Sequence, residues 1–121
     1  TPESCEQRGV CSVQCVAEAD GSAYPCDFYA MDEYCLGNYN DSGIEEFLRS
    51  NTAVDFVRTS RKNGQACMRC PWFILCRNGC RRHRLPDGET GLYRNYFCEG
   101  YQMFFSKCAA RMKEIADYLK T

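Results

Sequence analysis

The chain has 121 residues, a formal charge of −1 at pH 7 and eleven cysteines. Its length suits one domain with a modest core. Its charge gives no indication of nucleic-acid binding, and no apolar run is long enough to predict a membrane partner. A secreted disulfide protein is a first interpretation of so many cysteines. The odd count and the two close Cys pairs between residues 67 and 80 argue against it.

Residues 11–26 predict a β-hairpin. Apolar and polar side chains alternate over residues 11–18, as in a half-buried strand. Asp20 and Gly21 supply a turn in which glycine can take a positive φ, and residues 23–26 return as the second strand. The hairpin would bring Cys11 and Cys26 toward the same end. Residues 36–40 then predict a loop.

Two short helices are predicted next, each from a capping signal. Residues 42–45 have the pattern of a capping box, and Thr52 with Asp55 repeats it for a second helix. The polar residues 59–66 would end this second helix. The side chains expected to be buried are Ile44, Phe47 and Leu48 in the first helix and Val54 and Val57 in the second.

The second half of the chain predicts a compact cysteine-rich segment and a long helix. Residues 72–75 form an apolar plug between the thiols, and a basic stretch with a turn at residues 86–88 follows. From about Glu99 to Lys120 the pattern is helical. We expect its apolar stripe to lie in the core, the alternative being a face that docks on a catalytic domain. The stripe consists of Phe104, Cys108, Met112, Ile115 and Leu119.

The predicted fold class is therefore α+β. We expect one small metal-stapled domain over residues 1–121, with an N-terminal β-hairpin, short helices, Cys-rich loops and a C-terminal helix.

Eight cysteines stand in a frame of characteristic spacing. Eight thiols can form two four-thiolate sites, which suit zinc or iron–sulfur clusters, and spacing alone does not choose between these metals. The compact part of the frame has the pattern Cys-x2-Cys-x5-Cys-x3-Cys. The eight cysteines are Cys5, Cys11, Cys26, Cys67, Cys70, Cys76, Cys80 and Cys98.

With Gly21 included, this frame resembles the SPASM domain, the C-terminal auxiliary-cluster domain of peptide-modifying radical S-adenosylmethionine enzymes. Residues 16–29, 36–38, 76–82 and 95–98 are similar to one branch, the anaerobic sulfatase-maturating enzymes. These enzymes oxidise a cysteine or serine of a target sulfatase to Cα-formylglycine. The resemblance covers nearly the whole chain.

The resemblance implies two [4Fe–4S] clusters that transfer electrons, each with four cysteine ligands. One cluster would be held by Cys5, Cys11, Cys26 and Cys80, and the other by Cys67, Cys70, Cys76 and Cys98. Asp27 matches the position of the general base that takes a proton from the target residue. Without the resemblance, Asp27 would be interpreted as a solvated loop carboxylate.

The chain departs from the family in one respect. Radical chemistry requires a Cys-x3-Cys-x2-Cys loop, but Cys11-x3-Cys15 is followed by Glu18 and Cys76-x3-Cys80 by His83. We therefore expect S-adenosylmethionine and a third [4Fe–4S] cluster in a radical domain outside this segment, which alone should be inactive. The expected partners are that domain of the same chain and the sulfatase peptide, in a monomeric cytoplasmic enzyme.

Two alternatives remain open. Another peptide modifier, such as a thioether-forming enzyme, could use the same frame for a different reaction. A noncatalytic, zinc-bound peptide-binding module could use the same thiolates, because tetrahedral sulfur suits both metals.

Several residues outside the frame have two interpretations. We expect Cys15 and Cys108 to be buried apolar thiols, with Cys15 an alternative first-cluster ligand, and Cys35 carries no motif. The basic residues near Cys80 could compensate cluster charge, dock a peptide or form a solvated loop; they are Arg77, Arg81, Arg82, His83 and Arg84. Four aromatics could pack around the site or line a peptide cleft: Tyr24, Phe28, Tyr29 and Tyr34.

Overall fold

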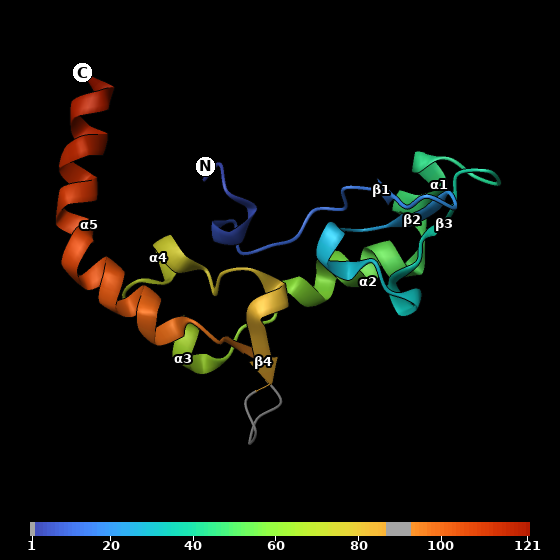
Figure 1. Cartoon of the computed structure of the whole chain (residues 1–121). Helices are drawn as coiled ribbons and strands as arrows, with labels where there is room; N and C mark the ends of the chain where they lie inside the picture. The colour runs from blue at the N-terminus through green and yellow to red at the C-terminus, as the bar shows by residue number, and fades with distance from the viewer. Residues whose placement is uncertain (1, 87–92) are drawn as a thin grey trace. The chain divides into compact units, whose positions relative to one another are not determined.

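The computed structural model describes residues 2–86 and 93–121 (Figure 1). The chain divides into two compact units. We call Arg8–Lys62 the hairpin unit, and Thr1–Gln7 together with Asn63–Thr121 the cysteine-rich unit. Short strands, short helices and a long C-terminal helix confirm the predicted α+β class. Among the described residues, no helix has the length and apolar character needed to cross a membrane.

The hairpin unit contains a three-stranded antiparallel sheet in the order β1-β2-β3. Strand β1 (Val16–Ala17) pairs with β2 (Ser22–Tyr24), and β2 pairs with β3 (Gly37–Asn38). The predicted hairpin is therefore present, and Gly21 takes the expected positive φ of 88°. The first strand is shorter than predicted because Cys15 has a left-handed φ of 53°, which interrupts the extended backbone.

Strand β3 corrects the prediction of a loop at residues 36–40. The strand is only two residues long, too short to show a period in the sequence. Gly37 has a φ of 141°, and a Cβ at this position would lie 2.7 Å from Cε1 of Phe47. Glycine therefore lets the sheet edge approach the aromatic ring closely.

Two 3-10 turns and two α-helices complete the hairpin unit. The turns are η2 (Asp27–Tyr29) and η3 (Asp32–Tyr34), and the helices are α1 (Ile44–Arg49) and α2 (Asn51–Ser60). Both helices were predicted, but their predicted N-caps differ from those in the structure. Gly43 precedes α1, and no side chain among the described residues caps it, so the predicted capping box at residues 42–45 is wrong.

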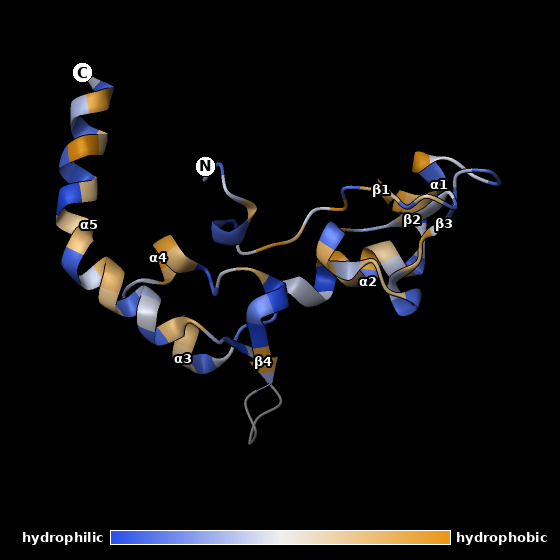
Figure 2. Ribbon diagram, in the orientation of Figure 1, coloured by the Kyte–Doolittle hydropathy of each residue, from blue (hydrophilic) through white to orange (hydrophobic). Residues whose placement is uncertain are grey.

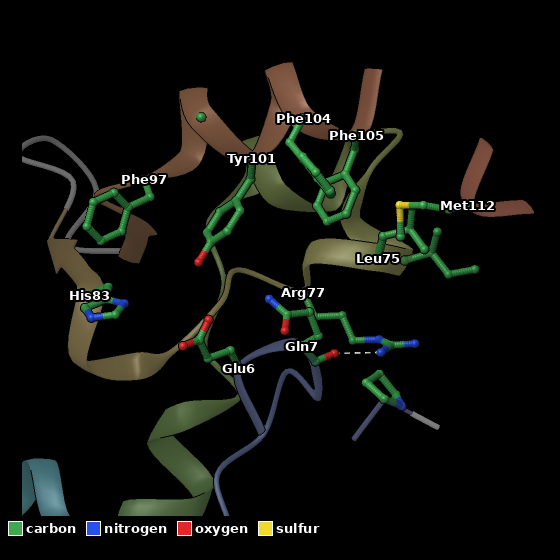
Figure 3. Close-up of a pocket in the computed structure, with 13 residues that line it drawn as sticks. Glu6, Gln7, Leu75, Arg77, His83, Phe97, Tyr101, Phe104, Phe105 and Met112 are labelled. Atoms are coloured by element: carbon green, nitrogen blue, oxygen red, sulfur yellow. Dashed lines mark hydrogen bonds between the residues drawn. The ribbon is translucent and has the colours of Figure 1, made fainter. Parts of the chain in front are cut away.

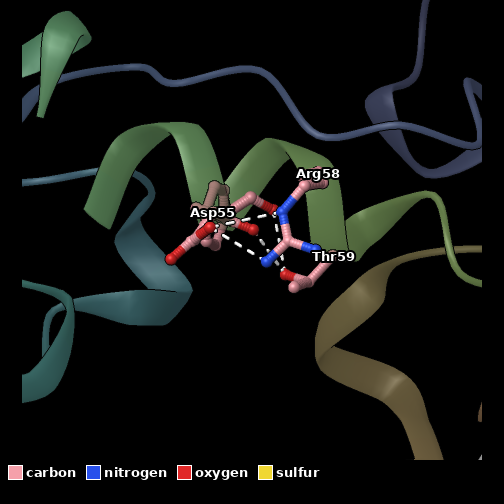
Figure 4. A network of polar contacts seen from close by, with 4 residues as sticks. Asp55, Arg58 and Thr59 are labelled. Atoms are coloured by element: carbon pink, nitrogen blue, oxygen red, sulfur yellow. Dashed lines mark hydrogen bonds and ion pairs between the residues drawn. The ribbon is translucent and has the colours of Figure 1, made fainter. Parts of the chain in front are cut away.

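Ser50 caps α2 in place of the predicted Thr52. Its hydroxyl accepts a hydrogen bond from the backbone N–H of Ala53 at 3.1 Å and donates one to the carbonyl of Phe47 at 2.7 Å. Asp55, predicted as the partner of Thr52, instead forms an exposed ion pair with Arg58 at 3.0 Å (Figure 4). An exposed pair of this kind contributes little to stability.

The apolar core of the hairpin unit lies between the sheet and the two helices. It contains Ala23, Leu36, Phe47 and Ala53, with Val13 and Cys15 packed against it. Beside the core, the ring of Tyr29 makes edge contacts with Phe56 at 5.0 Å and with Tyr34 at 4.8 Å between centroids.

Phe47 is 1% exposed, as expected, but Ile44 and Leu48 are 53% and 46% exposed, and Val54 is also exposed. The prediction of a buried face was therefore wrong for these three residues. Such short helices bury only a narrow strip of their surface.

The cysteine-rich unit is built from short elements and one long helix. The short elements are η1 (Cys5–Gln7), α3 (Gln65–Met68), α4 (Phe73–Cys76), η4 (Arg81–His83), β4 (Arg84–Pro86) and β5 (Tyr93–Asn95). Strands β4 and β5 form an antiparallel hairpin that the sequence did not predict. Asp87 and Gly88 of the predicted turn lie outside the described residues.

A buried polar network holds the loop after α4. The guanidinium of Arg84 donates to the backbone carbonyls of Arg77, Asn78 and Gly79 at 3.4, 3.0 and 2.8 Å. The side chain of Asn78 accepts from the N–H of Asn95 at 2.8 Å. Arg84 is thus a structural residue, and the interpretation of a solvated basic loop is wrong for it.

Helix α5 (Cys98–Lys120) confirms the predicted C-terminal helix. Of its described residues only Phe105 is buried, near the rings of Trp72 and Tyr101. The predicted core stripe is instead half-buried at Cys108 and exposed at its other four residues, of which Phe104 is 51% and Leu119 76% exposed. Figure 2 shows apolar residues recurring along the helix to its far end. The prediction that this stripe forms core was therefore wrong.

Candidate metal centre

Four thiols of the cysteine-rich unit line one cavity of about 170 Å³. Cys67 lies in α3 and Cys70 two residues after that helix, while Cys76 is the last residue of α4 and Cys98 the first of α5. All four cysteines therefore lie in or next to helices whose ends border the same cavity. Sequence spacing indicated the first three residues, and the fold adds Cys98 from 22 residues further along the chain.

The cavity wall is partly apolar and partly polar. Ala66, Trp72 and Phe73 provide apolar surface, so the predicted plug at residues 72–75 contributes only its first half here. The polar residues of the wall are Asn78, Arg94, Asn95, Tyr101 and Gln102. The apolar part of this wall limits the access of water to the thiols, and its polar part can contact a charged group in the cavity.

The thiols of this cavity favour a cationic occupant. Burial raises the pKa of Cys67 above the usual thiol value, and the neighbouring cysteines raise it further, because thiolates so close together repel one another. Burial also raises the pKa of Cys76, whereas hydrogen bonds from the backbone N–H groups of Asn78 and Gly79 act in the opposite direction. A positive metal core would remove the repulsion.

Three successive residues with left-handed backbone conformation direct the N–H groups of Asn78 and Gly79 toward Cys76. Arg77, Asn78 and Gly79 have φ values of 47°, 67° and 57°. A Cβ at Gly79 would lie 2.5 Å from Nδ2 of Asn95, so glycine is needed both for its φ and for space. Together with Arg84, this turn fixes the backbone around Cys76.

The donor set suits either of two occupants. Four thiolates can hold one zinc ion, with zinc–sulfur bonds of about 2.3 Å. Four thiolates are also the ligands of a [4Fe–4S] cluster, and here the four thiols border one cavity.

Cys98 has side-chain hydrogen-bond donors beside it. Nε2 of Gln102 donates to its Sγ at 3.4 Å, one helical turn along α5. The pKa of Arg94 is raised above its usual value, chiefly by a hydrogen bond between its side chain and Cys98. Neither residue could be identified from the sequence, apart from the i, i+4 spacing of Cys98 and Gln102.

The other predicted ligand set is divided between the two units. Cys5 and Cys80 belong to the cysteine-rich unit, where Nη1 of Arg77 donates to the carbonyl of Gln7 at 2.7 Å and links the two segments. Cys11 and Cys26 belong to the hairpin unit. This set of four stays a prediction.

Within the hairpin unit, one backbone hydrogen bond continues the strand pairing in the direction of Cys11 and Cys26. The N–H of Gln14 donates to the carbonyl of Pro25 at 2.8 Å, which extends the strand pairing toward both cysteines. The N–H of Cys11 donates to Oγ of Ser60 at 2.9 Å and thereby anchors this segment to the end of α2.

Asp27 is exposed at the start of η2, directly after Cys26. Tyr24 and Tyr29 are buried packing residues, whereas Phe28, beside Asp27, is 59% exposed. The packing interpretation therefore suits Tyr24, Tyr29 and the half-buried Tyr34, whose ring contacts that of Tyr29, and Phe28 remains available to a ligand. The role of Asp27 stays a prediction.

The remaining cysteines are half-buried. Cys15 packs against the core of the hairpin unit, and burial raises its pKa above the usual thiol value. Sγ of Cys35 donates to the carbonyl of Gly37 at 3.5 Å. Cys108, near the middle of α5, is half-buried rather than buried as predicted.

A second, larger hollow of about 900 Å³ in the cysteine-rich unit was not predicted (Figure 3). Phe97, Tyr101 and Phe104 reach into it from α5 and the residue before it, and Glu6 and Arg77 lie opposite. Its remaining lining residues are Pro2, Gln7, Ile74, Leu75, His83, Gly100, Phe105 and Met112. The sequence signal was present in the apolar stripe of α5, which we had assigned to a core.

His83 also lines this hollow. Its ring contacts Phe97 edge-on at 5.2 Å between centroids, and its buried Nδ1 has no hydrogen-bond partner among the residues described. All four cysteines of the candidate cavity lie outside η4, the element of His83, and His83 does not line that cavity.

Comparison with known protein families gives the class. The SPASM family, described as an iron–sulfur cluster-binding domain, matches residues 5–71, more than half of the chain. The chain therefore belongs to the SPASM family of iron–sulfur cluster-binding domains.

More specific similarity is to one group of enzymes. The chain is 40% identical over 117 residues to a cysteine-type anaerobic sulfatase-maturating enzyme of Clostridium perfringens (strain 13 / Type A), covering 97% of this chain and 32% of that protein. It is 40% identical over 118 residues to the enzyme of the same description from Clostridium novyi (strain NT), covering 98% and 32%. The chain thus spans about a third of these relatives.

Solved structures show the same fold. Native anSMEcpe with bound AdoMet aligns with a TM-score of 0.89 at 39% identity, over 97% of this chain and 32% of that one. Native anSMEcpe with bound AdoMet and Kp18Cys peptide aligns with a TM-score of 0.90 at 39% identity, over 98% and 33%.

Proposed function

We propose that the protein is the auxiliary-cluster domain of a radical S-adenosylmethionine sulfatase maturase, which oxidises a cysteine or serine of a target sulfatase to Cα-formylglycine. One observation carries this proposal: four thiols line one cavity in a chain that is 40% identical to anaerobic sulfatase-maturating enzymes. The reaction class is transferred from those relatives.

In this proposal the chain holds two [4Fe–4S] clusters. Cys67, Cys70, Cys76 and Cys98 are the ligands of one, and Cys5, Cys11, Cys26 and Cys80 are the ligands of the other. Such clusters, when bound, supply acceptors for single electrons. Trp72 and Phe73 shield the thiols from water, and the turn at residues 77–79 together with Arg84 fixes Cys76.

Asp27 provides the proton acceptor. Its carboxylate is exposed, so a target thiol or hydroxyl can approach it, and its position directly after Cys26 places it next to a cluster ligand. A carboxylate within hydrogen-bond distance of the reacting group can take its proton as the target residue is oxidised. Phe28 offers apolar contact to the same target.

The rest of the enzyme supplies S-adenosylmethionine and a third cluster. The exposed apolar residues of α5 and the hollow beside them suit cover by this radical domain, because so much apolar surface is unfavourable in water. Bound Kp18Cys and Cp18Cys peptides in the solved relatives support a peptide of the sulfatase as partner. We place the complete enzyme in the cytoplasm, as a monomer.

The test of the base is Asp27→Asn in the complete maturase. Aldehyde formation on a target peptide, followed by mass spectrometry, should fall about 100-fold or more, because asparagine cannot take the proton. Iron content should be unchanged.

Asp32→Asn is the matched control, since Asp32 is also exposed at the first position of a 3-10 turn. It should leave aldehyde formation at the wild-type level. Wild-type turnover in Asp27→Asn would remove Asp27 from the mechanism.

Product and metal content separate the alternatives. A thioether cross-link in the peptide would identify another modifier of the class. Two zinc ions, with no iron or labile sulfide after anaerobic purification, would identify the noncatalytic module.

A further inference from the structure

We propose that Gln102 sets the reduction potential of the cluster held by Cys67, Cys70, Cys76 and Cys98, through its hydrogen bond to the sulfur of Cys98. This inference rests on the proposed function, because it requires a cluster in this cavity. Gln102 is a positioning and tuning residue rather than a ligand.

The geometry makes Gln102 specific to one thiol. Nε2 of Gln102 lies 3.4 Å from Sγ of Cys98, and both residues line the cavity. Because they are four residues apart on the 23-residue helix α5, the helix itself holds the amide against the sulfur.

Two further features make the surroundings of Cys98 positive, in addition to the hydrogen bond from Gln102. It is the first residue of α5, where unpaired backbone N–H groups make the helix end positive. Arg94 lines the same cavity and adds a permanent charge. Donors to a ligand sulfur favour the state with more negative charge.

Reduction adds one electron and converts a [4Fe–4S] core from 2+ to 1+, so these donors raise the reduction potential. The donors of Cys76 are backbone N–H groups in a fixed turn, which no substitution of a side chain removes directly. Gln102 and Arg94 are therefore the side-chain donors through which a sequence change can alter the potential while all four ligands remain, and Gln102 is the neutral one that helix α5 holds against Cys98.

The experiment uses the anaerobically purified 121-residue protein with dithionite as the reductant. Gln102→Met keeps the length of the side chain and removes the N–H donor. An EPR-monitored redox titration should show the ratio of reduced to oxidised cluster about tenfold lower at a fixed potential, which is a shift of about 59 mV for one electron. Only one of the two clusters should shift.

Two further variants complete the design. Gln102→Glu replaces the donor with a negative oxygen and should lower the potential at least as far. Ser106→Ala is the control, since Ser106 lies one turn further along α5 and its hydroxyl donates to the carbonyl of Met103 at 2.9 Å, not to a thiol. It should leave both potentials unchanged.

The outcomes are distinguishable. Wild-type protein without iron and sulfide contradicts the proposed function itself. Wild-type iron content with unchanged potentials in Gln102→Met and Gln102→Glu overturns the role of Gln102. If Gln102→Met binds less iron than the wild type, Gln102→Glu becomes the test. A reduction potential at or above the wild-type value in Gln102→Glu also overturns the inference.

Discussion

The two units of the chain are stabilised in different ways. The hairpin unit has an apolar core in which Phe47 is 1% exposed and small residues pack around it. The buried side chains of the cysteine-rich unit are mostly polar, namely Asn78, Arg84 and Asn95, with Phe105 as the buried apolar residue of α5. Apolar packing thus stabilises one unit, whereas buried hydrogen bonds stabilise the other.

This difference indicates where a bound metal matters most. A small core gains its stability from area removed from water, which needs no ligand. Four thiols around a cavity gain theirs only when a metal binds, because without it no bond joins the segments that carry them. We therefore expect the two units to respond differently to the same treatment.

Metal removal should have the largest effect and should separate the units. After chelation, backbone amides of α3 and α4 should exchange with solvent at least about 100-fold faster, because metal binding contributes about 10 kcal/mol in small metal-bound domains. Amides of α2 should change little. Hydrogen exchange with mass spectrometry measures both in one experiment.

Cys70→Ala should reproduce this pattern, and Cys35→Ala, which lies outside the ligand frame, should not. Full protection of α3 and α4 after chelation would show that the cysteine-rich unit is stable without metal. It would contradict the difference that we propose between the two units.

Phe47→Ala tests the other unit. Loss of this buried ring should lower the free energy of unfolding of the hairpin unit by about 3–5 kcal/mol. The four-thiol cavity shares no residue with this core, so its metal content should remain. Urea titration followed by exchange in α2, together with iron analysis, measures the two effects.

Leu48→Ala is the control for this variant, because Leu48 is adjacent and 46% exposed. Leu48→Ala should lower the free energy of unfolding by well under half as much as Phe47→Ala. Equal costs for the two substitutions would mean that Phe47 does not form the centre of this core.

The smallest effect concerns the start of α2. Ser50→Ala removes the hydroxyl that accepts from Ala53 and should cost about 1 kcal/mol. Thr52→Ala changes the residue that the sequence suggested and should cost less than about 0.5 kcal/mol. Thermal unfolding of both variants decides between the two caps, and a larger loss for Thr52→Ala would restore the sequence-based assignment.

The sequence predicted features that depend on local spacing. The hairpin turn at Gly21 and the helix from about Glu99 follow from backbone freedom and a 3.6-residue period, and both are confirmed. The family resemblance rested on cysteine spacing and is confirmed by the match over residues 5–71.

Burial was harder to predict, because it depends on what lies opposite each residue. The apolar stripe of α5 has a helical period, but no layer within the cysteine-rich unit covers most of it, so Phe104 and Leu119 are exposed. Strands β4 and β5 were missed because polar residues, Arg84 and Asn95, occupy their buried positions. Gln102 was missed because no sequence pattern indicates a hydrogen bond from an amide to a sulfur atom.

The left-handed turn at residues 77–79 has one more consequence. We assign Cys76 to one cluster and Cys80 to the other, and no other pair of ligands from the two sets is so close in sequence. With that assignment, the backbone between them would be the shortest covalent bridge between the two proposed clusters. Three positive φ angles and the guanidinium of Arg84 fix its conformation, so the proposal predicts a fixed length for this bridge.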